Sequence, residues 1–277
     1  MIPFVTLADL WRAERARRLA RFAHLPRLGE DGNTKDYENA DDDEGPVLVT
    51  EGKDAMSDNS VPPVPAYKRD AVRQDNWRDF NGAMRDGGFS PAQQFAYGET
   101  FAAEGGMSVN SQNGATAGIT RSTLNAAKNS GTIPGLDAVH SPSDLSPAQV
   151  AAIYQFQTDR NFGTVGGANA LNDVGNQYAA AALADTLFWE GSGDGAQTVQ
   201  QAINRVIVNS GSSLPGVAED GRMGPGTLGA YTALSQDPTS QAYLLDALAF
   251  ERIAWGATQP GPIDTTRIDH FRFVDRR

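Results

Sequence analysis

Cysteine is absent from the 277-residue chain, and histidine occurs only at positions 24, 140 and 270. The first absence excludes disulfides and thiol chemistry. So few scattered histidines argue against a histidine-rich metal site, and a zinc enzyme is not expected. No apolar run reaches the roughly 20 residues of a bilayer-spanning helix, so we expect no transmembrane span. The net charge of −11 makes nucleic acid an unfavourable partner.

Charge is distributed unevenly over the first 65 residues. Residues 1–28 carry six arginines against two acids, a net of +4. Residues 29–65 carry eleven acids against two lysines, a net of −9, and include the acidic run NADDDEGP and clustered prolines. A segment with few large apolar side chains and many like charges buries too little surface to offset its ordering entropy. Residues 29–65 are therefore predicted to form a flexible tether.

The leader, residues 1–28, has a pattern of its own. Large apolar side chains recur at helical spacing with arginines between them, which predicts a basic amphipathic helix. The order of basic and apolar residues does not fit a secretory signal. One interpretation is a helix that docks on a carrier or a membrane surface. The other is a helix packed on its own core or on that of a partner. The apolar positions are Phe4, Leu7, Leu10, Trp11, Leu19 and Phe22.

The chain from residue 66 onward is predicted to be mainly α. Ser90 and Ser146 each precede a proline, which is typical of an N-cap followed by the first helical residue. Thr120 is a candidate cap for a short helix, and amphipathic patterns predict three further helices, over 176–190, 196–211 and 239–255. Strand-length alternation of apolar and polar residues is missing, so no sheet is expected.

Glu104 is a single acid in the small, polar stretch AEGGMSVNSQNGATAGIT. We expect it in the last turn of a helix, with Gly105 as a left-handed cap. Unpaired carbonyls there, and burial beside Phe101 and Met107, would raise the pKa of this carboxyl. A raised pKa suits a general acid, which has to hold a proton near neutral pH. The alternative is an ordinary exposed glutamate before a glycine cap.

The segment FAAEGGMSVNSQNGATAGITRSTLNAA resembles the signature of the glycoside hydrolase 108 family of bacterial and phage N-acetylmuramidases. LSPAQVAAIY, which ends at Tyr154, resembles the next helix of that family. ADTLFWEGSGDGAQTVQQAINRV and EDGRMGPGTLGAYTAL are similar to the predicted peptidoglycan-binding region that accompanies these enzymes. The resemblance covers about residues 90–256. The residues that match the family signature are Glu104, Gly105, Gly106, Gly114, Thr116, Gly118, Ile119 and Thr120.

This resemblance implies a lysozyme-like muramidase part at 66–190 and a helical peptidoglycan-binding part with a tail at 191–277. It implies cleavage of the β-1,4 bond between N-acetylmuramic acid and N-acetylglucosamine, with no metal or organic cofactor. Glu104 would be the general acid, and Asn113, Thr116 and Tyr154 would bind substrate or position water.

Two positions depart from the family pattern. Met107 stands where the family has an aromatic residue, and Asn113 stands where it has aspartate. Asparagine cannot act as a base, although it can still hold a water molecule or a sugar hydroxyl. The substitution favours the alternative function, a non-catalytic peptidoglycan-binding or virion structural protein that keeps the fold.

Glycoside hydrolysis normally uses two carboxylates, so a muramidase of this kind is expected to hold a second acid. Asp185 lies in the apolar run ALADTLFW, where an acid is costly unless it is paired or useful. It is either this second acid or a core acid satisfied by a cap or an arginine.

The segment DGRMGPGT is either part of a polymer-binding groove or a connector between helices. We expect a turn at Asp220-Gly221, a positive φ at Gly224, and a helix that opens at Pro225.

A muramidase acts in the periplasm or at the cell wall, and no Sec signal is visible in this sequence. Lysis, a secretion apparatus or a virion could deliver it. The last two routes suit a leader that binds a carrier protein.

Overall fold

The computed structural model describes residues 72–272, and the predictions for the leader and the tether lie outside these residues. The described part is built from α-helices and short 3₁₀ turns, which confirms the mainly α prediction. The α-helices are α2 (Gln74–Asp86), α3 (Pro91–Ala103), α4 (Arg121–Ser130), α5 (Pro147–Asn161), α6 (Ala170–Asp173), α7 (Gln177–Glu190), α8 (Ser192–Ser210), α9 (Pro225–Gln236), α10 (Pro238–Gly256) and α11 (Thr265–His270). The 3₁₀ turns are η3 (Leu136–Ala138), η4 (Pro142–Asp144), η5 (Gly163–Val165) and η6 (Gly167–Asn169).

Helix starts follow the capping signals of the sequence. Ser90 and Ser146 both form complete capping boxes, each with the glutamine three residues later, and each is followed by proline. The Thr120 side chain accepts a hydrogen bond from the Thr123 amide at the start of α4. These side chains satisfy amide groups that a helix N-terminus otherwise leaves without a partner.

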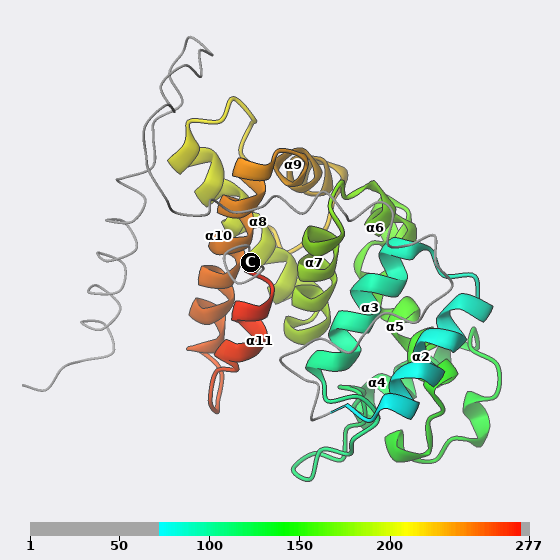
Figure 1. Ribbon diagram of the computed structural model, residues 1–277. Helices are drawn as coiled ribbons and strands as arrows, with labels where there is room; N and C mark the ends of the chain where they lie inside the picture. The colour runs from blue at the N-terminus through cyan, green and yellow to red at the C-terminus, as the bar shows by residue number, and fades with distance from the viewer. Residues whose placement is uncertain (1–71, 273–277) are drawn as a thin grey trace, which may run out of the picture. The chain divides into compact units, whose positions relative to one another are not determined.

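Helix α7 lies at the centre of the described residues (Figure 1). It packs against α3 on one side and against α8 on the other. Residues 179–184, AAAALA, are all buried, as expected of a helix that is apolar all round. Small alanine side chains let the neighbouring helices approach closely. The backbone carbonyl of Ala179 also accepts a hydrogen bond of 2.8 Å from the hydroxyl of Tyr231 in α9.

The core on the α3 side of α7 is aromatic. Phe80 of α2 stacks on Phe101 of α3 with ring centroids 4.1 Å apart. Tyr154 of α5 meets Phe80, Tyr97 and Phe188 edge-on. Such edge-to-face pairs add about 0.5–1.5 kcal/mol each beyond the burial of their area. These contacts connect α2, α3, α5 and α7.

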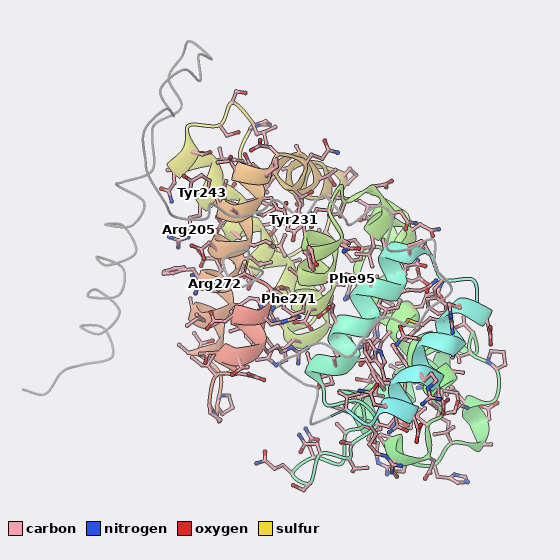
Figure 2. All side chains as sticks on the ribbon, viewed as in Figure 1. Phe95, Arg205, Tyr231, Tyr243, Phe271 and Arg272 are labelled. Atoms are coloured by element: carbon pink, nitrogen blue, oxygen red, sulfur yellow. The ribbon has the colours of Figure 1, made fainter. Side chains whose placement is uncertain are left out.

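Helices α8 and α10 pack along each other on the opposite side of α7. Figure 2 labels Arg205 and Tyr243 on this pair, and the Arg205 guanidinium lies 4.1 Å from the ring centroid of Phe250 in α10. Phe271 and Arg272, also labelled in Figure 2, directly follow α11. Arg272 donates to Asp246 of α10 at 2.6 Å, and this ion pair connects the end of α11 to α10.

The boundary predicted at 190/191 falls at Gly191, between α7 and α8. One hydrophobic core runs from Val72 to Phe271 across this position. The residues before and after Gly191 therefore share one core. The assignment of catalysis to 66–190 and of peptidoglycan binding to 191–277 stays a prediction. Among the described residues, no helix has both the length and the apolar character needed to cross a membrane.

The DGRMGPGT segment differs in one detail from the expectation. Gly221 has the positive φ, at 70°, whereas Gly224 is extended, with φ −88° and ψ 171°. Pro225 opens α9 as predicted. The buried side chain of Gln200 in α8 donates to Asp220 and accepts from the Gly221 amide, at 2.8 and 2.9 Å. Gln200 thus bonds this turn to α8, which favours the connector.

We predict that Ser146→Ala lowers the free energy of unfolding by about 1 kcal/mol, because it removes the acceptor of the α5 capping box. Equilibrium urea unfolding measures the loss. The control is Ser213→Ala, an exposed loop position where a change of less than about 0.5 kcal/mol is expected. Equal effects of the two substitutions would show that the cap contributes nothing.

Candidate active site around Glu104

Glu104 is the residue at which α3 ends. The amides of Gly105 and Gly106 donate back to the carbonyls of Ala102 and Phe101, at 3.0 and 2.8 Å. Both glycines have positive φ, at 79° and 65°, which confirms the left-handed cap predicted at Gly105. This hydrogen-bond pattern is a Schellman motif, and it fixes the backbone that carries the Glu104 side chain.

A tight turn at residues 116–119 lies against the Glu104 carboxyl. Thr116 and Ile119 exchange backbone hydrogen bonds of 3.2 and 2.8 Å, and Ala117 and Gly118 between them have φ of 50° and 68°. A Cβ atom on Gly118 would lie 2.5 Å from Cδ of Glu104. Glycine is therefore required at 118 both by the backbone conformation and by the close approach of the carboxyl group.

Tyr154 bonds the same turn from the protein core. It is fully buried, and its hydroxyl donates to the carbonyl of Ala117 at 2.9 Å. Burial raises the pKa of Tyr154, and the nearby negative charge of Glu104 raises it further. Ala117 is the one non-glycine residue with positive φ in the described part of the chain, so this hydrogen bond stabilises a strained position.

Arg267, from α11, is the direct partner of Glu104. Its Nη1 donates to Oε1 of Glu104 at 2.5 Å. Its Nη2 and Nε donate to the two oxygens of Asp185 at 2.7 and 3.1 Å, a bidentate pair. The Arg267 side chain is 4% exposed, the Asp185 side chain is fully buried, and the Glu104 side chain is 18% exposed. Glu104 is thus the member of this group that solvent reaches.

Asp185 has a second cation, Arg252 of α10, at 2.7 Å. Burial alone would raise the pKa of Asp185, but the two arginines outweigh it and lower this pKa to about 2. Asp185 is therefore ionised and bonded on both oxygens, so the structure supports its interpretation as a core acid satisfied by arginine. The role of second catalytic acid requires a free carboxyl group, which Asp185 does not offer.

Glu190 completes the buried charge network at the end of α7. Its Oε1 lies 3.5 Å from Nε of Arg252, and its Oε2 accepts a 2.6 Å hydrogen bond from Thr198 of α8. Burial raises the pKa of Glu190 to about 7, despite Arg252 and Thr198, which lower it. This carboxyl group thus changes its charge within the neutral pH range.

A second pair joins the same two helices. His270 of α11 contacts the carboxylate of Glu99 of α3. Helix α11 thus contacts α3 and its C-cap at two acids, Glu99 and Glu104.

Asn113 and Thr116 lie on the loop that leads into the turn. Asn113 is exposed, and its Oδ1 accepts a 2.9 Å hydrogen bond from the Ala115 amide, which shapes the loop. The Thr116 side chain is buried, and within residues 72–272 its hydroxyl has no hydrogen-bond partner. A buried hydroxyl without a protein partner can take an ordered internal water molecule. A role for Asn113 in substrate binding stays a prediction.

The sequence did not reveal Arg267 or Arg252 as part of the site. In the structure the Glu104 carboxyl group is bonded to a cation, which its surrounding sequence does not indicate. Asp264 and the Thr-Thr that follows are a local signal for the start of α11. No local signal indicates that this helix reaches Glu104.

We predict that Gly118→Ala destabilises the protein by about 1–3 kcal/mol more than Gly114→Ala, because only the methyl group at 118 overlaps the Glu104 side chain. Both glycines have φ of 68°, so the two alanines carry the same backbone cost. Nothing lies within 4 Å of a Cβ at 114. Equal losses in urea unfolding would refute the close approach.

The raised pKa of Glu190 predicts a pH-dependent stability. Between about pH 4.5 and 7 the folded protein holds a proton that the unfolded chain has lost, so the free energy of unfolding falls as pH rises through this range. Glu190→Gln removes this contribution. The free energy of unfolding of the wild type minus that of the variant should fall from pH 4.5 to 7 and level off above pH 7. Urea unfolding across this range measures it.

The control for this pH series is Glu219→Gln, which changes an exposed carboxylate. Its stability profile should run parallel to that of the wild type. A Glu190→Gln profile that is also parallel to the wild type would contradict the assignment.

Comparison of the chain with protein-family models, with curated proteins and with solved structures finds no match. Its function is therefore inferred from the residues and geometry around Glu104.

Proposed function

We propose that this protein is a lysozyme-like N-acetylmuramidase that hydrolyses the β-1,4 bond between N-acetylmuramic acid and N-acetylglucosamine in peptidoglycan, with Glu104 as the general acid. The observation that carries the proposal is the placement of Glu104. Its carboxyl group is partly exposed, fixed at a helix end, pressed against the Gly118 turn and held by a buried arginine.

Arg267 gives this carboxyl group a defined orientation. It bonds Oε1, while Oε2 faces the Gly118 turn. A proton on Glu104 would be donated to the glycosidic oxygen as the bond to the sugar breaks. Glu104 becomes negative in that step, and Arg267 stabilises the charge as it develops. Asp185 keeps Arg267 in position through its bidentate pair.

The hydroxyl of Thr116 supports a role for the turn in holding an internal water molecule near Glu104. It is buried and unpaired among the described residues, on the same turn that contacts Glu104. Water attacks the sugar carbon after the leaving group is protonated, and a hydroxyl is a suitable group to orient it. Asn113 is available at the surface of the loop for a sugar hydroxyl.

A second function, non-catalytic binding of peptidoglycan or a structural role in a virion, is favoured by one observation. Asp185, the candidate second carboxylate, is bonded to both Arg252 and Arg267. A protein that binds wall polymer without cleaving it needs neither a free second acid nor a protonated Glu104.

In either role the protein would meet its substrate in the periplasm or at the cell wall. Residues 1–28 would bind a virion or secretion-carrier protein and residues 29–65 would act as the tether. Both segments lie outside the described residues.

We expect Glu104→Gln to reduce release of soluble fragments from purified peptidoglycan by about 10²–10⁴-fold, the contribution of a general acid. Glutamine keeps an oxygen that accepts the Arg267 hydrogen bond, so the folded structure is retained. Mass spectrometry of the fragments should find N-acetylmuramic acid at the new reducing ends.

The matched control is Glu99→Gln. Glu99 lies on α3, the helix that Glu104 caps, and likewise contacts a side chain of α11, His270. This variant should keep most of the wild-type activity. If the wild type releases no fragments but sediments with insoluble peptidoglycan, and Glu104→Gln sediments equally well, the non-catalytic function is the correct one.

A further inference from the structure

A groove of about 370 Å³ opens between the first turns of α8 and the end of α10. Asp194, Gln197 and Gln201 of α8 line one side, and Trp255 and Gln259 line the other. The two helices pack side by side, so both walls of the groove are fixed by the core. The volume is in the range typical of small-ligand sites.

Trp255 is held rigidly at the edge of this groove. Its indole N–H donates to Oδ2 of Asp194 at 3.0 Å. Its ring meets Trp189 edge-on, with centroids 5.5 Å apart. The side chain nevertheless stays partly exposed. A large aromatic surface that is already fixed in place loses little entropy when a ligand stacks on it.

The polar lining is suited to a neutral ligand with many hydroxyl or amide groups. The glutamine amides at 197, 201 and 259 each offer both donors and acceptors. The residues that line the groove include no lysine, arginine or histidine to attract an anion. The one carboxylate, Asp194, is already engaged by the indole N–H, which makes it less available to a cation.

The groove is connected to the candidate active site through side chains. The Arg267 guanidinium lies 5.3 Å from the ring centroid of Trp189, and the same guanidinium bonds Glu104. The contacts therefore run from the groove through Trp255, Trp189 and Arg267 to the Glu104 carboxyl.

We infer that this groove binds a neutral, N-acetylated saccharide, with one sugar ring stacked on Trp255 and its hydroxyl and acetamido groups bonded to the glutamines. The choice of an N-acetylated β-1,4 glycan, and the role of the groove as a remote subsite, rest on the proposed function. Binding itself requires no turnover.

The test is calorimetric titration of the full chain with N-acetylglucosamine tetramer, in the Glu104→Gln background so that no hydrolysis occurs. Saturable binding is expected, and Trp255→Ala should weaken it at least about tenfold. Gln197→Ala should also weaken it, and because Gln197 is exposed this substitution leaves the core intact. Circular dichroism checks that both variants are folded.

The matched control is Asn209→Ala, an exposed position on the same helix but outside the groove, which should bind like the parent. Absence of saturable binding, or binding that neither Trp255→Ala nor Gln197→Ala weakens, would overturn the inference. Saturable binding of choline in place of the sugar would also overturn it, because it would identify a cation site. Loss of hydrolysis in Glu104→Gln with saccharide binding retained bears only on the proposed function. Absent binding together with intact wild-type hydrolysis refutes only the groove.

Discussion

The bonds that Arg252 and Arg267 make to buried carboxylates constrain the rest of this structure. Asp185 is fully buried at the centre of α7, where an unpaired charge would cost several kcal/mol. Both arginines therefore have to reach it, one from α10 and one from α11. This requirement fixes α10 and α11 relative to α7, and through Glu104 it fixes α3 as well. The candidate active site and the helix packing thus depend on the same charges.

A buried ion network of this kind is a poor source of net stability. Replacing such a network by apolar side chains of similar volume is often neutral or stabilising, whereas removing one partner costs about 3–5 kcal/mol. The network in this protein has one partly exposed member, Glu104, and every other member supports it directly or indirectly. That arrangement is what a preoriented catalytic carboxyl group requires, since its supporting residues have to be more rigid than the group itself. The same support suits a fixed polymer contact in a protein that only binds.

Local features of this fold could be predicted from the sequence, and distant pairings could not. Ser90, Thr120 and Ser146 indicate helix starts, because the side chain of an N-cap accepts a hydrogen bond from a backbone amide only two or three residues away. Gly105 indicates the end of α3, because glycine readily adopts the positive φ of a left-handed cap. Helix α2 has no side-chain cap at Arg73, and its signal in the sequence is the helical spacing of Trp77, Phe80 and Met84. Arg267 lies 163 residues from Glu104, and no spacing rule connects residues so far apart.

The order in which the charged residues are synthesised affects how the protein folds during translation. Asp185 leaves the ribosome 82 residues before Arg267, which at about 5–20 residues per second is a delay of roughly 4–16 s. During that time α7 carries a carboxylate without its final partners, and an alanine-rich apolar helix cannot close around such a charge. The nascent helices α2 to α7 would therefore remain loosely packed and accessible to chaperones until α10 and α11 arrive. Docking of these two late helices is then the step that expels water from the centre of the molecule.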